Sequence, residues 1–243
     1  MKRDFKIVDV FSSTPLKGNP VAVVLDAENL DTEEMQAVAR WTNLSETTFI
    51  LPPTLPTASY RLRIFTPGNE LSFAGHPTLG SAFAALEAGR IYPSHGKVIQ
   101  ECGVGTVDIR ISENRLFLEL PHASLSPLAP EIVTEIETIL DQPVSEDMPP
   151  AIVDVGITWI IACMKNADTI VGLNPDQQRL LALSKKLKSA GLTVFGRQKP
   201  SEETRIEVRT FAPACGVEEE PVCGSGNGCV AAFLRDYGAH TSP

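Results

Sequence analysis

The amino-acid sequence resembles itself at an offset of about 145 residues, and this internal repeat constrains the fold more than any other feature. The matches keep their order along the chain, which chance similarity would not arrange. In that order they pair 8–10 (VDV) with 153–155 (VDV), 48–49 (TF) with 194–195 (VF), 62–68 (LRIFTPG) with 208–214 (VRTFAPA), and 74–82 (AGHPTLGSA) with 223–231 (CGSGNGCVA). We therefore expect two structurally equivalent halves, with Gly75 and Gly224 at equivalent positions.

Local patterns predict the same order of elements in each half. Val- and Ile-rich strands are followed by a helix, two more strands and a second helix that is apolar and rich in small residues. Asp31 begins a capping-box pattern that predicts a helix over 32–42. The expected class is α+β, a duplicated pseudo-symmetric fold in which each half is an antiparallel barrel-like sheet around a central apolar helix. The expected domains are 1–122, a linker with a short helix over 123–150, and 151–243.

Charge and hydropathy exclude several classes of protein. The chain carries 21 Lys and Arg residues against 30 Asp and Glu, with a net charge of −9, and its basic residues are scattered. Nucleic acid is therefore not an expected partner. No apolar stretch approaches the ~18 residues of a membrane span, and no signal-peptide pattern is present, so we expect no membrane partner and a cytoplasmic location. Five cysteines without a CxxC pair, and four separated histidines, predict no disulfide framework and no metal site.

A glycine-containing turn precedes each apolar helix. The first contains Gly75, and the second contains Gly224, Ser225 and Gly226. Helix N-termini present unpaired backbone N–H groups and the positive end of the helix dipole, so two such turns facing one cleft would bind a carboxylate or enolate-like anion from both sides. The alternative is that these glycines only let the helices pack closely.

Four side chains near these turns are candidates for chemistry. His76 follows the first glycine and could donate a hydrogen bond or transfer a proton, although a lone histidine is more often structural. Glu46 begins an otherwise uncharged strand, and its alternative is a solvent-facing edge position. Glu220 is the one of three consecutive glutamates close enough in sequence to reach the second turn. Cys223 could act as an acid or base if the helix terminus lowered the pKa of its thiol.

Four segments together carry a resemblance that spans nearly the whole chain. They are VDVFSSTPLKGNPVAVV (8–24), LSETTFI (44–50), FTPGNELSFAGHPTLG (65–80) and FAPACGVEEEPVCGSGNGCVAAFL (211–234). With these segments the chain resembles the phenazine-biosynthesis PhzF-like family, which shares its fold with diaminopimelate epimerase. The resemblance implies a duplicated fold with the active site between the halves, no cofactor and, as is common among relatives, a homodimer.

The resemblance also implies roles for particular residues. Glu46 corresponds to the family's general acid/base glutamate, Gly75 and His76 to the GH of the first turn, and Gly224 and Ser225 to the GS of the second. Glu220 corresponds to a carboxylate that is usually aspartate. The epimerase branch of the fold uses two cysteines, one opening each turn. Here Cys223 is present but Ala74 stands at the other position, so racemisation by two thiols is not expected.

The expected function is a cofactor-independent isomerase that moves a proton within a small carboxylate-bearing substrate. The expected catalytic residues are Glu46, His76 and Glu220. The substrate anion would be bound by the two turns, through Gly75 in the first and through Cys223, Gly224, Ser225 and Gly226 in the second. Relatives continue for further strands after the second apolar helix, so we expect a second half that is short at its C-terminus. The alternative is therefore a catalytically inactive or truncated relative acting as a small-molecule-binding or protein-interaction module.

Overall fold

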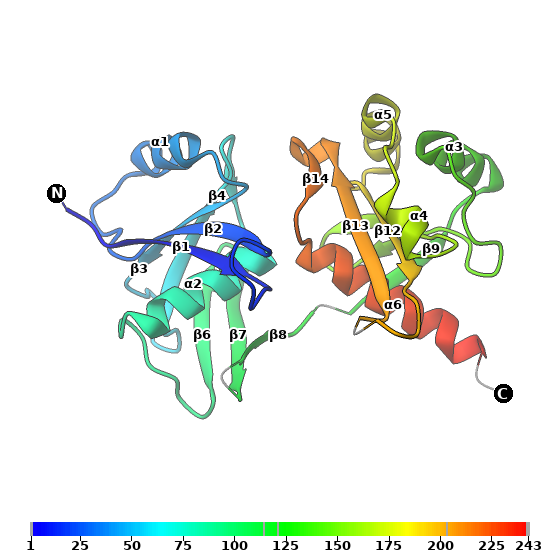
Figure 1. The fold of residues 1–243 in the computed structure, drawn as a ribbon. Helices are drawn as coiled ribbons and strands as arrows, with labels where there is room; N and C mark the ends of the chain where they lie inside the picture. Colours follow the sequence, from blue (N-terminus) through cyan, green and yellow to red (C-terminus); the bar gives the residue numbers. More distant parts are fainter. Residues whose placement is uncertain (1, 114, 121, 203, 242–243) are drawn as a thin grey trace. The chain divides into compact units, whose positions relative to one another are not determined.

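A computed structural model describes residues 2–113, 115–120, 122–202 and 204–241. The chain forms two compact units, Met1–Glu119 and Leu120–Pro243, each of which has its own sheet and helices (Figure 1). Within the described residues, no helix is both long enough and apolar enough to cross a membrane.

The first unit is an eight-stranded sheet with one helix on each face. Strand order is β1-β2-β3-β4-β6-β7-β8, and β5 pairs with β4. The elements are β1 (Phe5–Val10), β2 (Asn19–Val24), α1 (Thr32–Thr42), β3 (Thr47–Leu51), β4 (Tyr60–Phe65), β5 (Glu70–Leu71), α2 (Gly75–Glu87), β6 (Lys97–Cys102), β7 (Gly105–Ser112) and β8 (Arg115–Leu118). Helix α2 contacts both β1 and β8, the first and last strands of that order, so the sheet curls around it.

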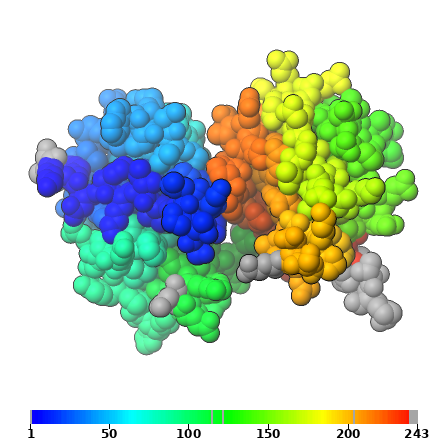
Figure 2. All heavy atoms as spheres, viewed as in Figure 1, coloured from blue at the N-terminus to red at the C-terminus, as the bar shows by residue number. Residues whose placement is uncertain are grey.

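Two hydrophobic clusters explain the helices of this unit. Helix α2 is rich in Ala, Gly and Ser, and most of its residues are buried against the concave side of the sheet. At Gly80 an added Cβ would lie 2.4 Å from Val21 Cγ1, so only glycine allows the helix to approach β2 this closely. Helix α1 packs on the other side through Met35 and Ala39, and its opposite side lies at the surface of the unit (Figure 2). The capping box predicted at Asp31 is confirmed.

The second unit repeats much of this plan. Its six strands have the order β14-β13-β12-β11-β10-β9. The elements are β9 (Ser124–Pro127), α3 (Pro130–Leu140), β10 (Ala151–Asp154), β11 (Thr158–Cys163), α4 (Ala167–Val171), α5 (Gln177–Leu187), β12 (Leu192–Arg197), β13 (Ile206–Ala212), a 3₁₀ turn (Pro213–Cys215), β14 (Val217–Glu220) and α6 (Gly224–Thr241). Helix α6 packs on β10, β11 and β12, while α3, α4 and α5 contribute to a separate core.

Equivalent residues of the repeat occupy equivalent structural positions. Arg63 in β4 donates two hydrogen bonds to Glu70 of β5 and lies over the Phe65 ring. Arg209 in β13 makes the same bidentate contact with Glu219 of β14 and lies over the ring of Phe211. The duplicated, pseudo-symmetric fold is thus confirmed, with one long apolar helix packed on each sheet.

Two features differ from the expected architecture. The sheets are mixed, because three pairs of neighbouring strands run parallel: β2 with β3, β4 with β6, and β11 with β12. In each case the connection between the two strands contains a helix and is not a hairpin. The segment 123–150, expected to be a linker with a short helix, contains β9, which pairs with β10, and α3, whose Ile136, Ile139 and Leu140 are buried in a core cluster. These apolar side chains make the segment part of the second unit.

Candidate active site

Helix α2 begins at Gly75 without a side-chain cap. The N-cap residue, Ala74, is extended (φ −154°, ψ 140°) and offers no side-chain oxygen to the backbone N–H groups of the first turn. The first turn also contains no acidic residue. An N-terminus of this kind favours an anion, because its amide donors and the positive end of the helix dipole lack a fixed negative partner.

Glu46 and His76 meet beside this turn. The Oε2 atom of Glu46, the residue before β3, lies 3.5 Å from Nε2 of His76, and the two side chains are 15% and 9% exposed. The backbone carbonyl of Glu46 accepts a hydrogen bond from the Ala22 N–H, which fixes the start of the strand. The alternative of a solvent-facing edge carboxylate therefore does not hold for Glu46.

His76 is a neutral imidazole at pH 7. Burial lowers its pKa from 6.5 to about 4, and a hydrogen bond to the backbone of Pro20 opposes this shift only in part. Proline has no N–H, so its carbonyl must accept this bond from a ring N–H. Nε2 makes no hydrogen bond and faces Glu46, which leaves Nδ1 as the donor to Pro20. Nε2 therefore presents a lone pair to the carboxyl group, and a proton on Glu46 would point towards an acceptor.

This burial predicts that stability depends on the protonation of His76. Its pKa is lower in the folded than in the unfolded chain, so the unfolded chain binds more protons below pH 6.5, and stability is lost as pH falls from 6.5 towards 4. We expect a loss of about 2 kcal/mol between pH 7 and pH 5 from this residue. Urea unfolding at the two pH values measures it. His76→Gln should remove this loss, whereas the exposed His122→Gln should retain it; an equal loss in His76→Gln would contradict the expectation.

The surroundings of Gly75 leave room for a side chain. An added Cβ would meet only Leu118 Cδ2 at 3.8 Å, an ordinary contact. Alanine is a better helix former, so Gly75→Ala should raise the free energy of unfolding by about 0.5 kcal/mol. If substrate approaches this backbone, the same methyl group should raise KM severalfold. Denaturant unfolding and steady-state kinetics test both effects, with Gly68→Ala as a control outside the turn. An unchanged KM in Gly75→Ala would exclude Gly75 from the site.

The second turn is organised around a buried thiol. Cys223 directly precedes α6, and its Sγ accepts a hydrogen bond from the Gly226 N–H at 3.3 Å. Burial raises the pKa of Cys223, which is therefore a neutral thiol at pH 7. The condition under which Cys223 could act as an acid or base, a pKa lowered by the helix terminus, is not met, because desolvation of the thiolate outweighs the helix N–H that stabilises it. Asn227 Nδ2 donates to the Cys223 carbonyl at 2.8 Å and ties the turn to the next residues of the helix.

Ser225 carries the hydroxyl group of this turn, and the residue is half-buried. Its Oγ accepts a hydrogen bond at 3.0 Å from Nε1 of Trp159, and lies 3.6 Å from Cys223 Sγ. Trp159 comes from β11, 66 residues earlier in the chain. The sequence alone points to neither Trp159 nor Pro20, because a contact between a strand and a helix distant in the chain leaves no local motif.

The three glutamates of β14 have different surroundings. Glu219 Oε2 lies 2.7 Å from Arg209 Nη2, and this ion pair links β14 to β13. Glu220 is half-buried, pairs with Thr210 of β13, and lies near enough to Cys223 to raise its pKa. Of the three, Glu220 is the one whose charge acts on Cys223 of the second turn.

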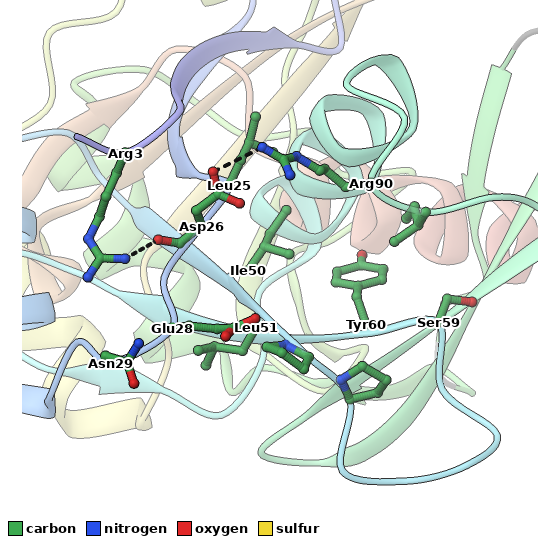
Figure 3. A pocket seen from close by; sticks show the side chains of 13 residues that line it. Arg3, Leu25, Asp26, Glu28, Asn29, Ile50, Leu51, Ser59, Tyr60 and Arg90 are labelled. Carbon is green, nitrogen blue, oxygen red and sulfur yellow. Dashed lines mark hydrogen bonds and ion pairs between the residues drawn. The ribbon is translucent and has the colours of Figure 1, made fainter. Parts of the chain in front are cut away.

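A cavity of about 430 Å³ in the first unit includes none of these residues (Figure 3). Its walls are polar and apolar in nearly equal measure, and two of its charged groups, Arg90 and Asp26, pair with each other. Arg90 bridges the carboxylates of Asp4 and Asp26, and Arg3 donates to the Asp26 carbonyl. The cavity lacks a convergent set of catalytic groups, so the Glu46–His76 pair remains the better candidate site in this unit.

Comparisons with known proteins identify the family of this chain. A family model described as phenazine biosynthesis-like protein, PhzC-PhzF, matches residues 8–243. Antisense-enhancing sequence 1 of Schizosaccharomyces pombe is 42% identical over 241 residues, which cover 96% of this chain and 80% of the relative. Trans-2,3-dihydro-3-hydroxyanthranilate isomerase of Pseudomonas fluorescens is 32% identical over 237 residues, 97% of this chain and 81% of the relative.

A solved structure extends the similarity to three dimensions. The phenazine biosynthesis protein of the PhzF family from Bacillus anthracis has a TM-score of 0.87 and 25% identity, and the match covers 100% of this chain and 83% of that one. Several relatives are named isomerases. The chain is therefore an enzyme of the isomerase class that belongs to the phenazine biosynthesis-like family PhzC-PhzF.

Proposed function

We propose that this isomerase needs no cofactor and moves a proton between carbon atoms of a small carboxylate-bearing substrate. The observation that carries the proposal is the largely buried Glu46–His76 contact beside the uncapped start of α2. A carboxylate can take a proton from one carbon and return it to another, provided that the substrate stays in place. The amides of the first turn would stabilise the negative charge that develops on the substrate meanwhile.

His76 supports this cycle as a neutral partner. Because its Nδ1–H is held by Pro20, the Nε2 lone pair can accept a hydrogen bond from Glu46 after the carboxylate has been protonated. The pair thus gains one proton when substrate is deprotonated and loses it when product forms. Cys223, Gly224, Ser225 and Gly226 are proposed to bind the substrate anion and Glu220 to act on the substrate. That both turns line one cleft stays a prediction, as do a homodimer and a cytoplasmic location.

The first substrate to test is trans-2,3-dihydro-3-hydroxyanthranilate, the compound named for the relatives from Pseudomonas. Protein dialysed against a chelator, with no added cofactor, should convert it, and the rate should not rise when divalent metals, nicotinamide or flavin cofactors are added back. A strict requirement for any of these additions would contradict the proposed mechanism.

The alternative is a module that binds small molecules without converting them. Calorimetric binding of the same compound without conversion would favour it, whereas turnover that depends on Glu46 would support the isomerase.

A further inference from the structure

A partly buried hydrogen bond in the second unit joins the indole of Trp159 to Ser225. The indole is 3% exposed and belongs to the core cluster that also contains Cys223 and Phe233. Its Nε1–H can only donate, so Ser225 Oγ is the acceptor of the 3.0 Å bond. One of the two lone pairs of the serine hydroxyl is therefore occupied from inside the protein.

The thiol of Cys223 determines which further hydrogen bonds the Ser225 hydroxyl can make. Its Sγ already accepts the Gly226 N–H, and it lies 3.6 Å from Ser225 Oγ. Cys223 remains protonated at pH 7, so its S–H can donate to the second lone pair of Ser225. When the S–H donates to Ser225, donors occupy both lone pairs and the hydroxyl proton of Ser225 is left to donate away from the core. Donation into the oxygen then makes the hydroxyl a stronger donor.

We propose that Trp159 is a positioning residue that fixes the Ser225 hydroxyl as a donor to the carboxylate of the substrate. The inference rests on the proposed function and refines it: this part of the site selects a negatively charged acceptor over a group that itself donates hydrogen bonds. Ser225 is half-buried, so its hydroxyl is within reach of a ligand, while Trp159 stays behind it in the core.

Ligand binding tests this selection with a matched pair of probes. Anthranilate is a stable aromatic carboxylate related to the substrate of the relatives, and anthranilamide replaces its carboxylate by an amide. The wild type should bind anthranilate about tenfold or more tightly than anthranilamide. Trp159→Phe, which removes the N–H but keeps a ring, should weaken anthranilate binding about fivefold and change anthranilamide binding less than twofold. The control Trp41→Phe, at an 83% exposed position, should change neither.

A double-mutant cycle separates positioning from general packing. In a Ser225→Ala background, adding Trp159→Phe should change anthranilate affinity less than twofold, because the hydroxyl that Trp159 positions is absent. An equal loss of affinity in both backgrounds, or an equal loss for both probes in Trp159→Phe, would overturn the inference.

A spectroscopic measurement avoids any change to Trp159. The chain has two tryptophans, so its two indole N–H resonances are readily assigned with Trp41→Phe. In Ser225→Ala the Trp159 indole proton should move upfield while that of Trp41 stays in place. An unshifted Trp159 resonance would refute the positioning role, whereas wild-type protein that fails to bind anthranilate would contradict the proposed substrate class; the two failures are thus distinguishable.

Discussion

Glu46→Gln should lower kcat by about 100-fold or more and leave substrate affinity within a fewfold, as expected for the loss of a general acid/base. Glutamine keeps the size and much of the hydrogen bonding of the glutamate but has no basic oxygen to accept a proton. The side chain is 15% exposed and lies against His76, so bulk water has little access to replace it. Steady-state kinetics on a substrate that the wild type converts measures the effect.

The matched control for this variant is Glu218→Gln, an exposed carboxylate at the start of β14 that should leave kcat unchanged. Thermal unfolding should show that Glu46→Gln is folded. If Glu46→Gln kept more than about a tenth of the wild-type rate, well short of the ~10²-fold loss at the low end for such groups, Glu46 would not be the proton carrier. His76 or Glu220 would then be the residue to test.

Gly226→Ala should destabilise the protein by about 1–3 kcal/mol, the usual cost of an extra methyl group in a packed core. The added Cβ would lie 2.7 Å from Thr193 Oγ1, 2.9 Å from Thr210 Oγ1 and 3.2 Å from Cys223 Sγ. The two threonines are almost fully buried, pair across β12 and β13 and hydrogen-bond to each other, so neither can move away cheaply. The helix start must shift instead, and the Cys223 contact shifts with it.

The comparison with Gly75→Ala makes this prediction specific. Both changes add one methyl group in the first turn of an apolar helix. Gly226→Ala should nevertheless destabilise the protein, whereas Gly75→Ala should stabilise it slightly. Denaturant unfolding of the two variants and of Gly68→Ala measures the difference. Equal stabilities for Gly226→Ala and Gly75→Ala would show that the glycine at 226 is not required by packing.

The sequence predicts most elements of the fold, and the exceptions have a physical cause. Repeated strands and apolar helices were predictable because each half must bury the same kind of apolar face, and Asp31 and Glu34 encode the start of α1 locally. The parallel pairs β2–β3, β4–β6 and β11–β12 were not predictable, because strand direction depends on how a crossover returns to the sheet. The docking of α3 depends on long-range contacts with the rest of the second unit.

The candidate site also has features that the sequence predicts and features that arise only in the folded chain. A motif can identify Glu46 and His76, but their 3.5 Å contact arises only when β3 and α2 pack together. Protonation states were harder to predict than positions. The pKa of Cys223 is raised, not lowered, because burial of the thiol outweighs the favourable helix terminus, and burial is a property of the folded core. Trp159 reaches Ser225 from a strand that carries no motif.

Conversion in D₂O is the most direct test of proton transfer by this chain. Chelator-treated wild type, mixed with trans-2,3-dihydro-3-hydroxyanthranilate and followed by proton NMR, should form an isomer. Solvent deuterium should appear at the carbon that receives the proton to the extent that protonated Glu46 exchanges with water before it returns the proton. Glu46→Gln should give neither conversion nor exchange beyond the buffer rate, while Glu218→Gln should match the wild type. Wild-type protein that binds the compound but neither converts it nor exchanges its protons over hours would contradict the account and identify a binding module.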